Sequence, residues 1–202
     1  MAIENIVFDF GGVLVDWNPR HLYASEFADP DEMEYFLAIV CTPEWNLRQD
    51  AGRTFAEGIE ELEQLYPNYS VMIRKYFSEW HKMLKGEITE NVRLLNQLQS
   101  SARFTLFGLT NWSAETMPIA RQRFSFLQDF TGIVVSGEEK MVKPDKEIYR
   151  LLLQRYHLPA ERCLFIDDSE LNILTAREMG FHTIHYHGQV CLADELKRKG
   201  IL

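Results

Sequence analysis

Acidic, hydroxyl, amide and ammonium side chains follow the ends of several apolar segments in this 202-residue chain. They are Asp9, Thr110 with Asn111, Lys143, and Asp167 with Asp168. An acid that ends a buried apolar strand is costly, so Asp9 needs a functional reason. Three carboxylates gathered in one crevice repel one another unless a divalent cation or an ammonium group neutralises them. Because every candidate ligand is an oxygen, this chemistry favours Mg²⁺ over zinc.

The segments that precede these residues are nearly continuous apolar runs, which are typical of strands covered on both faces. We predict strands at 6–8, 104–109, 132–135, 163–166 and 182–186. Helical patterns lie between them: one capped by Thr89, one with Pro144 in its first turn, and one that ends at Gly180. This alternation indicates an α/β fold with a parallel, doubly wound sheet, in which ligands bind beyond the carboxyl ends of the strands.

Residues 17–86 differ from the rest because no strand pattern is visible there. Asp29 followed by Pro30 marks a helix start, and Thr54 with Glu57 fits a capping box. A third helical pattern follows Ser70. We therefore predict an all-helical insertion after the first strand.

Composition limits the classes of partner. Lys and Arg number 21 against 30 Asp and Glu, which gives a net charge of −9. This acidic balance argues against nucleic acid and against an anionic membrane as the main partner. The three cysteines are widely spaced and suggest neither disulfides nor a zinc site, and the amino-terminal residues resemble neither a signal peptide nor a membrane span. We expect a cytoplasmic protein that is a monomer or a weak homodimer.

Four short motifs resemble, in order, those of the haloacid dehalogenase (HAD) superfamily. They are FDFGGVL at 8–14, LTN at 109–111, KP at 143–144 and FIDDS at 165–169. Each alone is weak, but four in order, each at a predicted strand end, form a specific match over essentially the whole chain. The helical insertion lies where the C1-type cap of that family lies. The resemblance implies a Rossmann-like parallel core of residues 1–16 and 87–202 and an all-helical cap of residues 17–86.

The resemblance also implies roles in phosphoryl transfer. Asp9 corresponds to the nucleophile, which in phosphatases of this family becomes an aspartyl-phosphate that water later hydrolyses. Thr110 and Asn111 would bind the phosphoryl oxygens, and Lys143 would neutralise charge on the phosphoryl group and on Asp9. Mg²⁺ would be held by the Asp9 carboxylate, the Gly11 carbonyl and Asp168, with Asp167 beside it.

One position departs from the family pattern. The residue two after the nucleophile is usually a second Asp, which protonates the leaving group, whereas this chain has Gly11 there. Loss of a general acid commonly costs about 10²–10⁴-fold in rate, so we expect turnover to depend steeply on the leaving group. Asp16, near the junction with the cap, is a candidate to replace the missing acid.

The sequence thus predicts a Mg²⁺-dependent phosphatase acting on a small phosphorylated metabolite, such as a sugar phosphate. Two alternatives stay open. A 2-haloacid dehalogenase would also use Asp9 as its nucleophile. It would not need the acid that is missing at Gly11, because halide leaves without a proton. A non-catalytic binding protein could keep the fold and the metal site without turnover.

Overall fold

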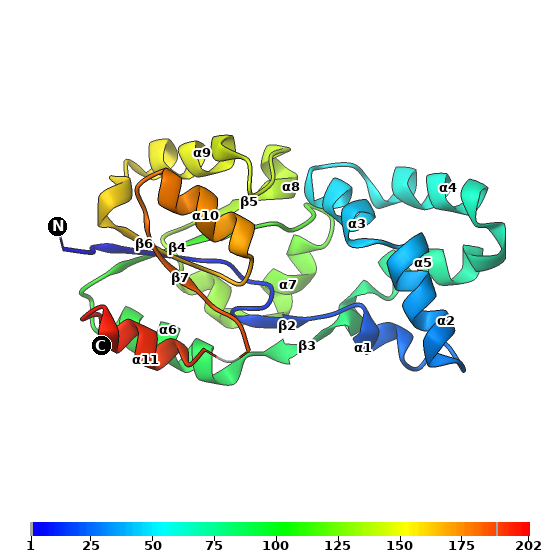
Figure 1. The fold of residues 1–202 in the computed structure, drawn as a ribbon, viewed down its shortest axis with the longest axis horizontal. Helices are drawn as coiled ribbons and strands as arrows, with labels where there is room; N and C mark the ends of the chain where they lie inside the picture. Colours follow the sequence, from blue (N-terminus) through cyan, green and yellow to red (C-terminus); the bar gives the residue numbers. More distant parts are fainter. Residues whose placement is uncertain (1, 189) are drawn as a thin grey trace.

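The computed structural model describes residues 2–188 and 190–202. Five strands form one parallel sheet in the order β5-β4-β1-β6-β7 (Figure 1). Their bounds are β1 Asn5–Phe8, β4 Thr105–Thr110, β5 Gly132–Val135, β6 Cys163–Asp167 and β7 His182–His185. The predicted α/β class is confirmed, and each predicted strand end lies within one residue of the observed end. Strand β1 is central, with Asn5 aligned to Thr105 of β4 and to Cys163 of β6.

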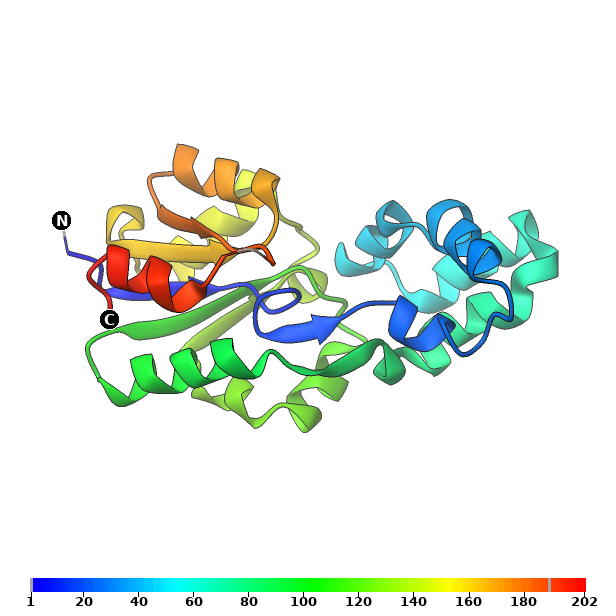
Figure 2. The same ribbon diagram turned by 60° about the horizontal axis from the view of Figure 1, so that its bottom comes forward.

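Helices cover both faces of the sheet (Figure 2). Helices α9 (Lys146–Tyr156) and α10 (Glu170–Glu178) lie on one face, and α6 (Thr89–Ser100), α7 (Met117–Arg123) and α11 (Leu192–Arg198) on the other. Alternate residues of β1 enter opposite layers: Val7 packs on the α9 and α10 side, while Ile6 and Phe8 join the other core. Burial on both faces explains why these strands are apolar without alternation.

Two predicted helix starts are wrong by one or two residues. Thr89 is the first residue of α6 rather than its cap, and its hydroxyl caps no backbone N–H. Pro144 precedes α9, because the Asp145 side chain accepts from the N–H of Glu147 and thereby fixes the helix start. The predicted stop is confirmed: Gly180, just after α10, has φ +92°, which favours glycine.

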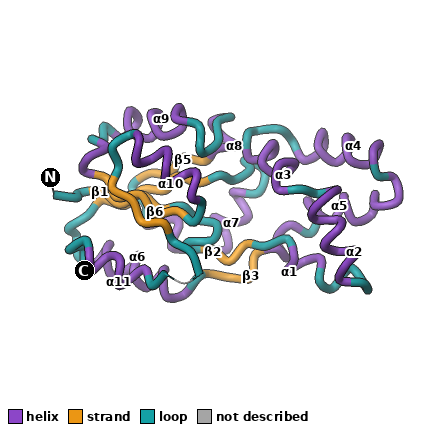
Figure 3. Tube along the Cα trace, in the orientation of Figure 1, coloured by secondary structure: helices purple, strands orange, loops and turns teal. Residues whose placement is uncertain are grey.

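The inserted segment is built of short helices (Figure 3). They are α1 Arg20–Tyr23, α2 Pro30–Tyr35, a π-helix Phe36–Val40, α3 Pro43–Asp50, α4 Phe55–Leu65, a 3-10 turn Pro67–Tyr69, α5 Ser70–Ser78 and a 3-10 turn Trp80–Met83. The predicted caps are confirmed: the Asp29 side chain accepts from Asp31 N–H, and Thr54 and Glu57 bond reciprocally.

A short antiparallel strand pair joins this segment to the sheet. Strand β2 (Val15–Trp17) pairs with β3 (Leu84–Glu87). The expectation of no strand within 17–86 is therefore wrong at both ends of the segment. Both strands are short, β2 alternates over only three residues, and the pairing is irregular between Asp16 and Trp17, so sequence periodicity does not reveal them.

The remaining elements connect the layers. They are the 3-10 turn Ser125–Asp129, the short helix α8 (Ser136–Glu139) and the 3-10 turn Ala160–Arg162. Both termini lie at the end of the sheet farthest from the inserted helices (Figure 1). Within the described residues, none of the helices combines the length and apolarity that a membrane crossing requires.

Candidate active site

The candidate residues gather at the carboxyl ends of three adjacent strands. Asp9 follows β1, Thr110 ends β4, and Asp167 ends β6. Since β4 and β6 flank β1 on opposite sides, the strand order reverses beside β1. A crevice forms at such a reversal in open parallel sheets. Lys143 reaches the same crevice from the segment between α8 and α9.

Lys143 is the hub of the cluster. Its Nζ lies 2.6 Å from Asp167 Oδ2 and 3.0 Å from Asp9 Oδ1, and it donates to the Leu109 carbonyl at 2.9 Å. An ammonium has three N–H groups, so each of them has an acceptor here. The side chain is fully buried. Burial alone would lower the pKa of Lys143, but the carboxylates of Asp167 and Asp9 together raise it, which keeps the amine charged.

Asn111 holds the backbone of Lys143. The Asn111 Nδ2 donates to the Lys143 carbonyl at 2.9 Å, and the Lys143 N–H donates to Asn111 Oδ1 at 2.8 Å. This pair of bonds ties the loop after β4 to the loop before α9. Asn111 thus positions Lys143, a role that the motif did not suggest, and its contact with phosphoryl oxygens stays a prediction.

Asp167 is surrounded by donors. Besides Lys143, its carboxylate accepts from the Ser169 N–H at 2.8 Å and from Asn172 Nδ2 at 2.9 and 3.1 Å. Asn172 was not predicted as a site residue; it lies on the buried face of α10. Because Asp167 is so fully hydrogen-bonded, Asp9 and Asp168 are the carboxylates with more freedom to hold a ligand.

The three carboxylates form a compact oxygen cluster. One oxygen each from Asp9, Asp167 and Asp168 lie within 4.8 Å of one another. Burial raises the pKa of Asp9 to about 7, and the charges of Asp167 and Asp168 add to this effect while Lys143 opposes it. Three carboxylates against one ammonium leave two negative charges when all are ionised. One divalent cation would balance them, and oxygen-only donors suit Mg²⁺.

The loop after Asp9 contains two glycines with opposite surroundings. Gly12 has φ +71°, and a Cβ there would lie 2.2 Å from Asp168 Oδ2, so glycine lets the loop approach that carboxylate. A Cβ on Gly11 would meet no heavy atom within 4 Å. The position of the missing second acid therefore faces open space.

Thr110 contributes a hydroxyl without a partner. The residue is fully buried, and its Oγ1 has no hydrogen-bond partner among the described residues. A buried hydroxyl without an acceptor is costly. An anion bound at the end of β4 would supply that acceptor.

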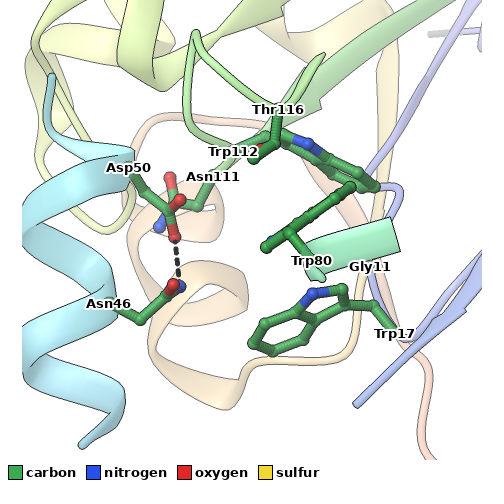
Figure 4. A pocket seen from close by; sticks show the side chains of 8 residues that line it. All are labelled: Gly11, Trp17, Asn46, Asp50, Trp80, Asn111, Trp112 and Thr116. Atoms are coloured by element: carbon green, nitrogen blue, oxygen red, sulfur yellow. Dashed lines mark hydrogen bonds between the residues drawn. The ribbon is translucent and has the colours of Figure 1, made fainter. Parts of the chain in front are cut away.

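A cavity adjoins the cluster, and Asn46 and Asp50 of the inserted helix α3 form part of its wall (Figure 4). It encloses about 340 Å³ of atom-free space, part of it open to solvent, and is lined by Gly11, Trp17, Asn46, Asp50, Trp80, Asn111, Trp112 and Thr116. Only Gly11 and Asn111 of these were predicted site residues. Asp50 and the three indoles come from parts of the chain where packing and ligand contact give the same sequence pattern, so the sequence carried no signal for them.

Asp16 lies outside this cavity. Its Oδ1 is 2.8 Å from His21 Nε2, and its side chain is 41% exposed. It is absent from the cavity lining. The prediction that Asp16 replaces the missing acid therefore finds no support in the geometry.

Residues 6–186 match the family model of haloacid dehalogenase-like hydrolases. The chain belongs to the haloacid dehalogenase-like hydrolases. The family that the four motifs indicate is thus confirmed, and the chain is a hydrolase.

Several relatives of this HAD chain align over most of both lengths. The sesquiterpene phosphatase astK of Aspergillus oryzae is 25% identical over 95% of this chain and 94% of its own. The phosphorylated carbohydrates phosphatase of Thermotoga maritima is 26% identical, with 91% and 84% covered. A HAD family enzyme of Bacteroides thetaiotaomicron, solved as a magnesium complex, shares the fold with a TM-score of 0.76 at 21% identity, with 98% and 100% covered.

Proposed function

We propose that this HAD chain is a Mg²⁺-dependent phosphatase that hydrolyses a small phosphorylated metabolite through an aspartyl-phosphate on Asp9. The observation that carries the proposal is the cluster of Asp9, Asp167 and Asp168 around the buried Lys143, in a crevice next to a cavity. Residues 17–86 form the cap, of the C1 type, over a core of residues 1–16 and 87–202.

The donor set suits the metal. Asp9 and Asp168 would bind Mg²⁺ through carboxylate oxygens and Gly11 through its backbone carbonyl, with Asp167 alongside, where its bonds to Asn172 and Lys143 keep it in place. When bound, the ion stabilises negative charge on the transferring phosphoryl group. The Bacteroides relative has also been solved with both magnesium and inorganic phosphate, which agrees with this assignment.

The chain's own residues would divide the phosphoryl transfer among them. The Asp9 carboxylate attacks phosphorus, and the bond from phosphorus to the leaving oxygen breaks. The Lys143 ammonium, fixed by Asn111, offsets the negative charge of the transition state. The unpartnered Thr110 hydroxyl donates to a phosphoryl oxygen. Water then attacks phosphorus and restores Asp9.

The cavity favours a compact leaving group. It is small, and Trp17, Trp80 and Trp112 form the apolar part of its wall, while Asn46 and Asp50 contribute polar atoms. Apolar walls with a few placed polar groups are typical of sites for small metabolites. A sugar phosphate has apolar C–H faces and hydroxyls that match this lining, and the Thermotoga relative is named for phosphorylated carbohydrates.

Activity assays with and without metal test the proposal. Hydrolysis of p-nitrophenyl phosphate should require Mg²⁺, stop with a chelator, and vanish in Asp9→Asn. Release of halide from 2-chloropropionate that a chelator does not affect would contradict it and favour the dehalogenase. Of these two functions, the carboxylate cluster favours the phosphatase. A metal-free reaction would leave the excess negative charge of the three carboxylates without a balancing cation. Failure of both assays in a folded protein would leave the non-catalytic binding protein.

A further inference from the structure

We propose that Asp50, carried by the cap helix α3, is the general acid and base that Gly11 does not supply. This inference rests on the proposed phosphatase function. It assigns the two proton transfers of the reaction to a residue of the cap rather than to the loop that carries the nucleophile. Asp50 would touch the leaving oxygen directly and would therefore be a catalytic residue.

The position of Asp50 suits this role. Asp50 and Gly11 line the same cavity, with Asn111 on its wall as well. Gly11 is two residues from Asp9, and the space that a side chain at Gly11 would enter is free of heavy atoms within 4 Å of its Cβ position. Figure 4 shows the Asp50 side chain pointing from α3 toward the loop that carries Asn111 and Trp112. A carboxyl thus faces the leaving-group space from the opposite wall.

Contacts from the core fix Asp50 in place. The buried Ser136 hydroxyl donates to the Asp50 carbonyl at 2.6 Å, and Ser136 Oγ in turn accepts from the Trp112 N–H at 2.9 Å. On the side chain, Asn46 Nδ2 donates to Asp50 Oδ2 at 3.0 Å, and the Ser113 N–H also bonds the carboxyl. A residue held on both its backbone and its side chain is preorganised to act at one point.

Asp50 shares its cavity with three tryptophan side chains. Trp17, Trp80 and Trp112 form the apolar part of the cavity wall, and the Trp80 and Trp112 rings meet edge to face at 5.5 Å. Burial raises the pKa of Asp50 to about 7, and the Ser113 N–H opposes this. A group that titrates near neutral pH can both give and take a proton, which is what the two steps require.

The charged neighbours of Asp50 do not set its protonation. The titratable or charged side chains on α3 and on the segments around it are Glu44, Arg48, Arg53, Glu57, Glu60, Glu61, Glu63, Tyr76, Glu115, Glu138, Glu139 and Lys140. Arg48 and Arg53 pair with Glu61. The shift in the pKa of Asp50 arises from burial and from the Ser113 N–H.

Asp50 gives a proton when the aspartyl-phosphate forms and takes one back when it is hydrolysed. As Asp9 attacks phosphorus and the ester bond breaks, the protonated Asp50 gives its proton to the leaving alkoxide, so an alcohol departs and Asp50 becomes a carboxylate. In the second step the Asp50 carboxylate takes a proton from water, whose oxygen attacks phosphorus. The bond between phosphorus and Asp9 breaks and inorganic phosphate leaves. Asp50 is then protonated again, as it was before the first step.

A leaving-group comparison tests this assignment. The isosteric variant Asp50→Asn keeps a carbonyl oxygen to accept from Ser113 N–H but cannot donate an acidic proton. We expect it to lower kcat/KM about 10²–10⁴-fold for an alkyl phosphate such as glycerol phosphate. For p-nitrophenyl phosphate, whose phenolate leaves without a proton, kcat/KM should change less than about tenfold. Because the second step still needs a base, this variant should release a burst of p-nitrophenolate followed by slow turnover.

Two further variants separate proton transfer from structure. Asp16→Asn, which alters an acid outside the cavity, should match the wild type on both substrates. Adding Gly11→Asp to Asp50→Asn should restore alkyl phosphate hydrolysis, since the side chain has room. Equal losses on both substrates without a burst, or no loss at all, would overturn the role of Asp50. Should Asp50→Asn not fold, Asp50→Ser is compared in the same way. Absence of any Mg²⁺-dependent hydrolysis by the wild type would instead overturn the proposed function.

Discussion

The two walls of the active site are built on different principles. On the core wall, Asp9, Lys143 and Asp167 hold one another by direct ion pairs at the ends of central strands, and every N–H of the ammonium has an acceptor. On the cap wall, Asp50 is a single carboxyl among indoles, with neutral hydrogen-bond partners. In the proposed mechanism, the core wall supplies the charged groups for phosphoryl transfer, whereas the cap wall supplies one proton donor and limits the shape of the substrate.

The difference predicts how substitutions in each wall affect stability and activity. A buried charge cluster is interdependent, so removal of one member leaves the others unpaired and costs both stability and activity. A lone carboxyl in an apolar wall costs stability when it is ionised, so its loss can stabilise the fold while it harms the chemistry.

The largest effect is expected from Asp9→Asn. An amide cannot serve as the nucleophile, so kcat for p-nitrophenyl phosphate should fall by at least about 10⁴-fold. Stopped assays at saturating substrate measure the loss, with Asp16→Asn as the matched control. A residual rate within tenfold of the wild type would show that Asp9 does not carry the reaction.

The second-largest effect is expected from removal of the metal. Chelation should lower the rate by about 10³-fold or more, because the charge on the phosphoryl group loses its stabilisation, and added Mg²⁺ should restore it. Binding can be read without activity: Mg²⁺ at about 100 times its Kd should stabilise the wild type by about 2.7 kcal/mol. This stabilisation raises the Tm, and Asp168→Asn should abolish most of the rise in Tm that Mg²⁺ causes. An equal shift in this variant would contradict the assignment of Asp168 as a ligand.

Lys143→Met should affect stability as well as rate. It leaves the carboxylates of Asp9 and Asp167 facing each other without their cation, which we expect to lower the free energy of unfolding by about 3–5 kcal/mol. Denaturant melts with and without Mg²⁺ measure this, and added Mg²⁺ should recover part of the loss. A variant as stable as the wild type in metal-free buffer would contradict the interdependence of the core wall.

Asp50→Asn should behave in the opposite way on stability. The folded-state pKa of Asp50, about 7, lies above its ordinary value of 3.8, so ionisation penalises the folded state. The penalty is absent below the ordinary value and complete above about pH 7, so the gain in Tm from Asp50→Asn should grow as pH rises from about 4 to about 8. Thermal melts at several pH values measure it. A gain that is constant with pH would show that Asp50 is not buried as a costly carboxyl.

The smallest effect concerns the link between the two walls. Ser136→Ala removes the hydroxyl that bonds the Asp50 carbonyl, which should cost about 1 kcal/mol of stability. Because Asp50 is then less well placed, kcat/KM for an alkyl phosphate should fall several-fold more than kcat/KM for p-nitrophenyl phosphate. Equal changes for the two substrates would indicate a purely structural role for this contact.

Most of the core wall could be predicted from the sequence. Apolar runs that end in polar residues located β1, β4 and β6 and placed Asp9, Thr110 and Asp167 at one edge, because parallel strands share that edge. The site contacts of Asn172 could not be predicted, since a polar residue within a helix has the same pattern whether it faces solvent or a carboxylate.

The residues of the cap wall could not be predicted from the sequence, for a different reason. Asp50 ends a cap helix, and its approach to Gly11 depends on how the cap packs against the core through Ser136 and through the bond from Phe55 N–H to Glu115. Such contacts join residues far apart in the chain and leave no local pattern. The same holds for β2 and β3, whose pairing was likewise missed.

The most direct test of the account is the covalent intermediate on the core wall. The wild type is mixed with Mg²⁺ and p-nitrophenyl phosphate, quenched in acid within the first turnovers, and digested for mass spectrometry. We expect one phosphoryl group, on the peptide that contains Asp9, with more of it in Asp50→Asn and none in Asp9→Asn. Rapid turnover with a phosphoryl group on a different residue, or with none trapped in either the wild type or Asp50→Asn, would contradict it.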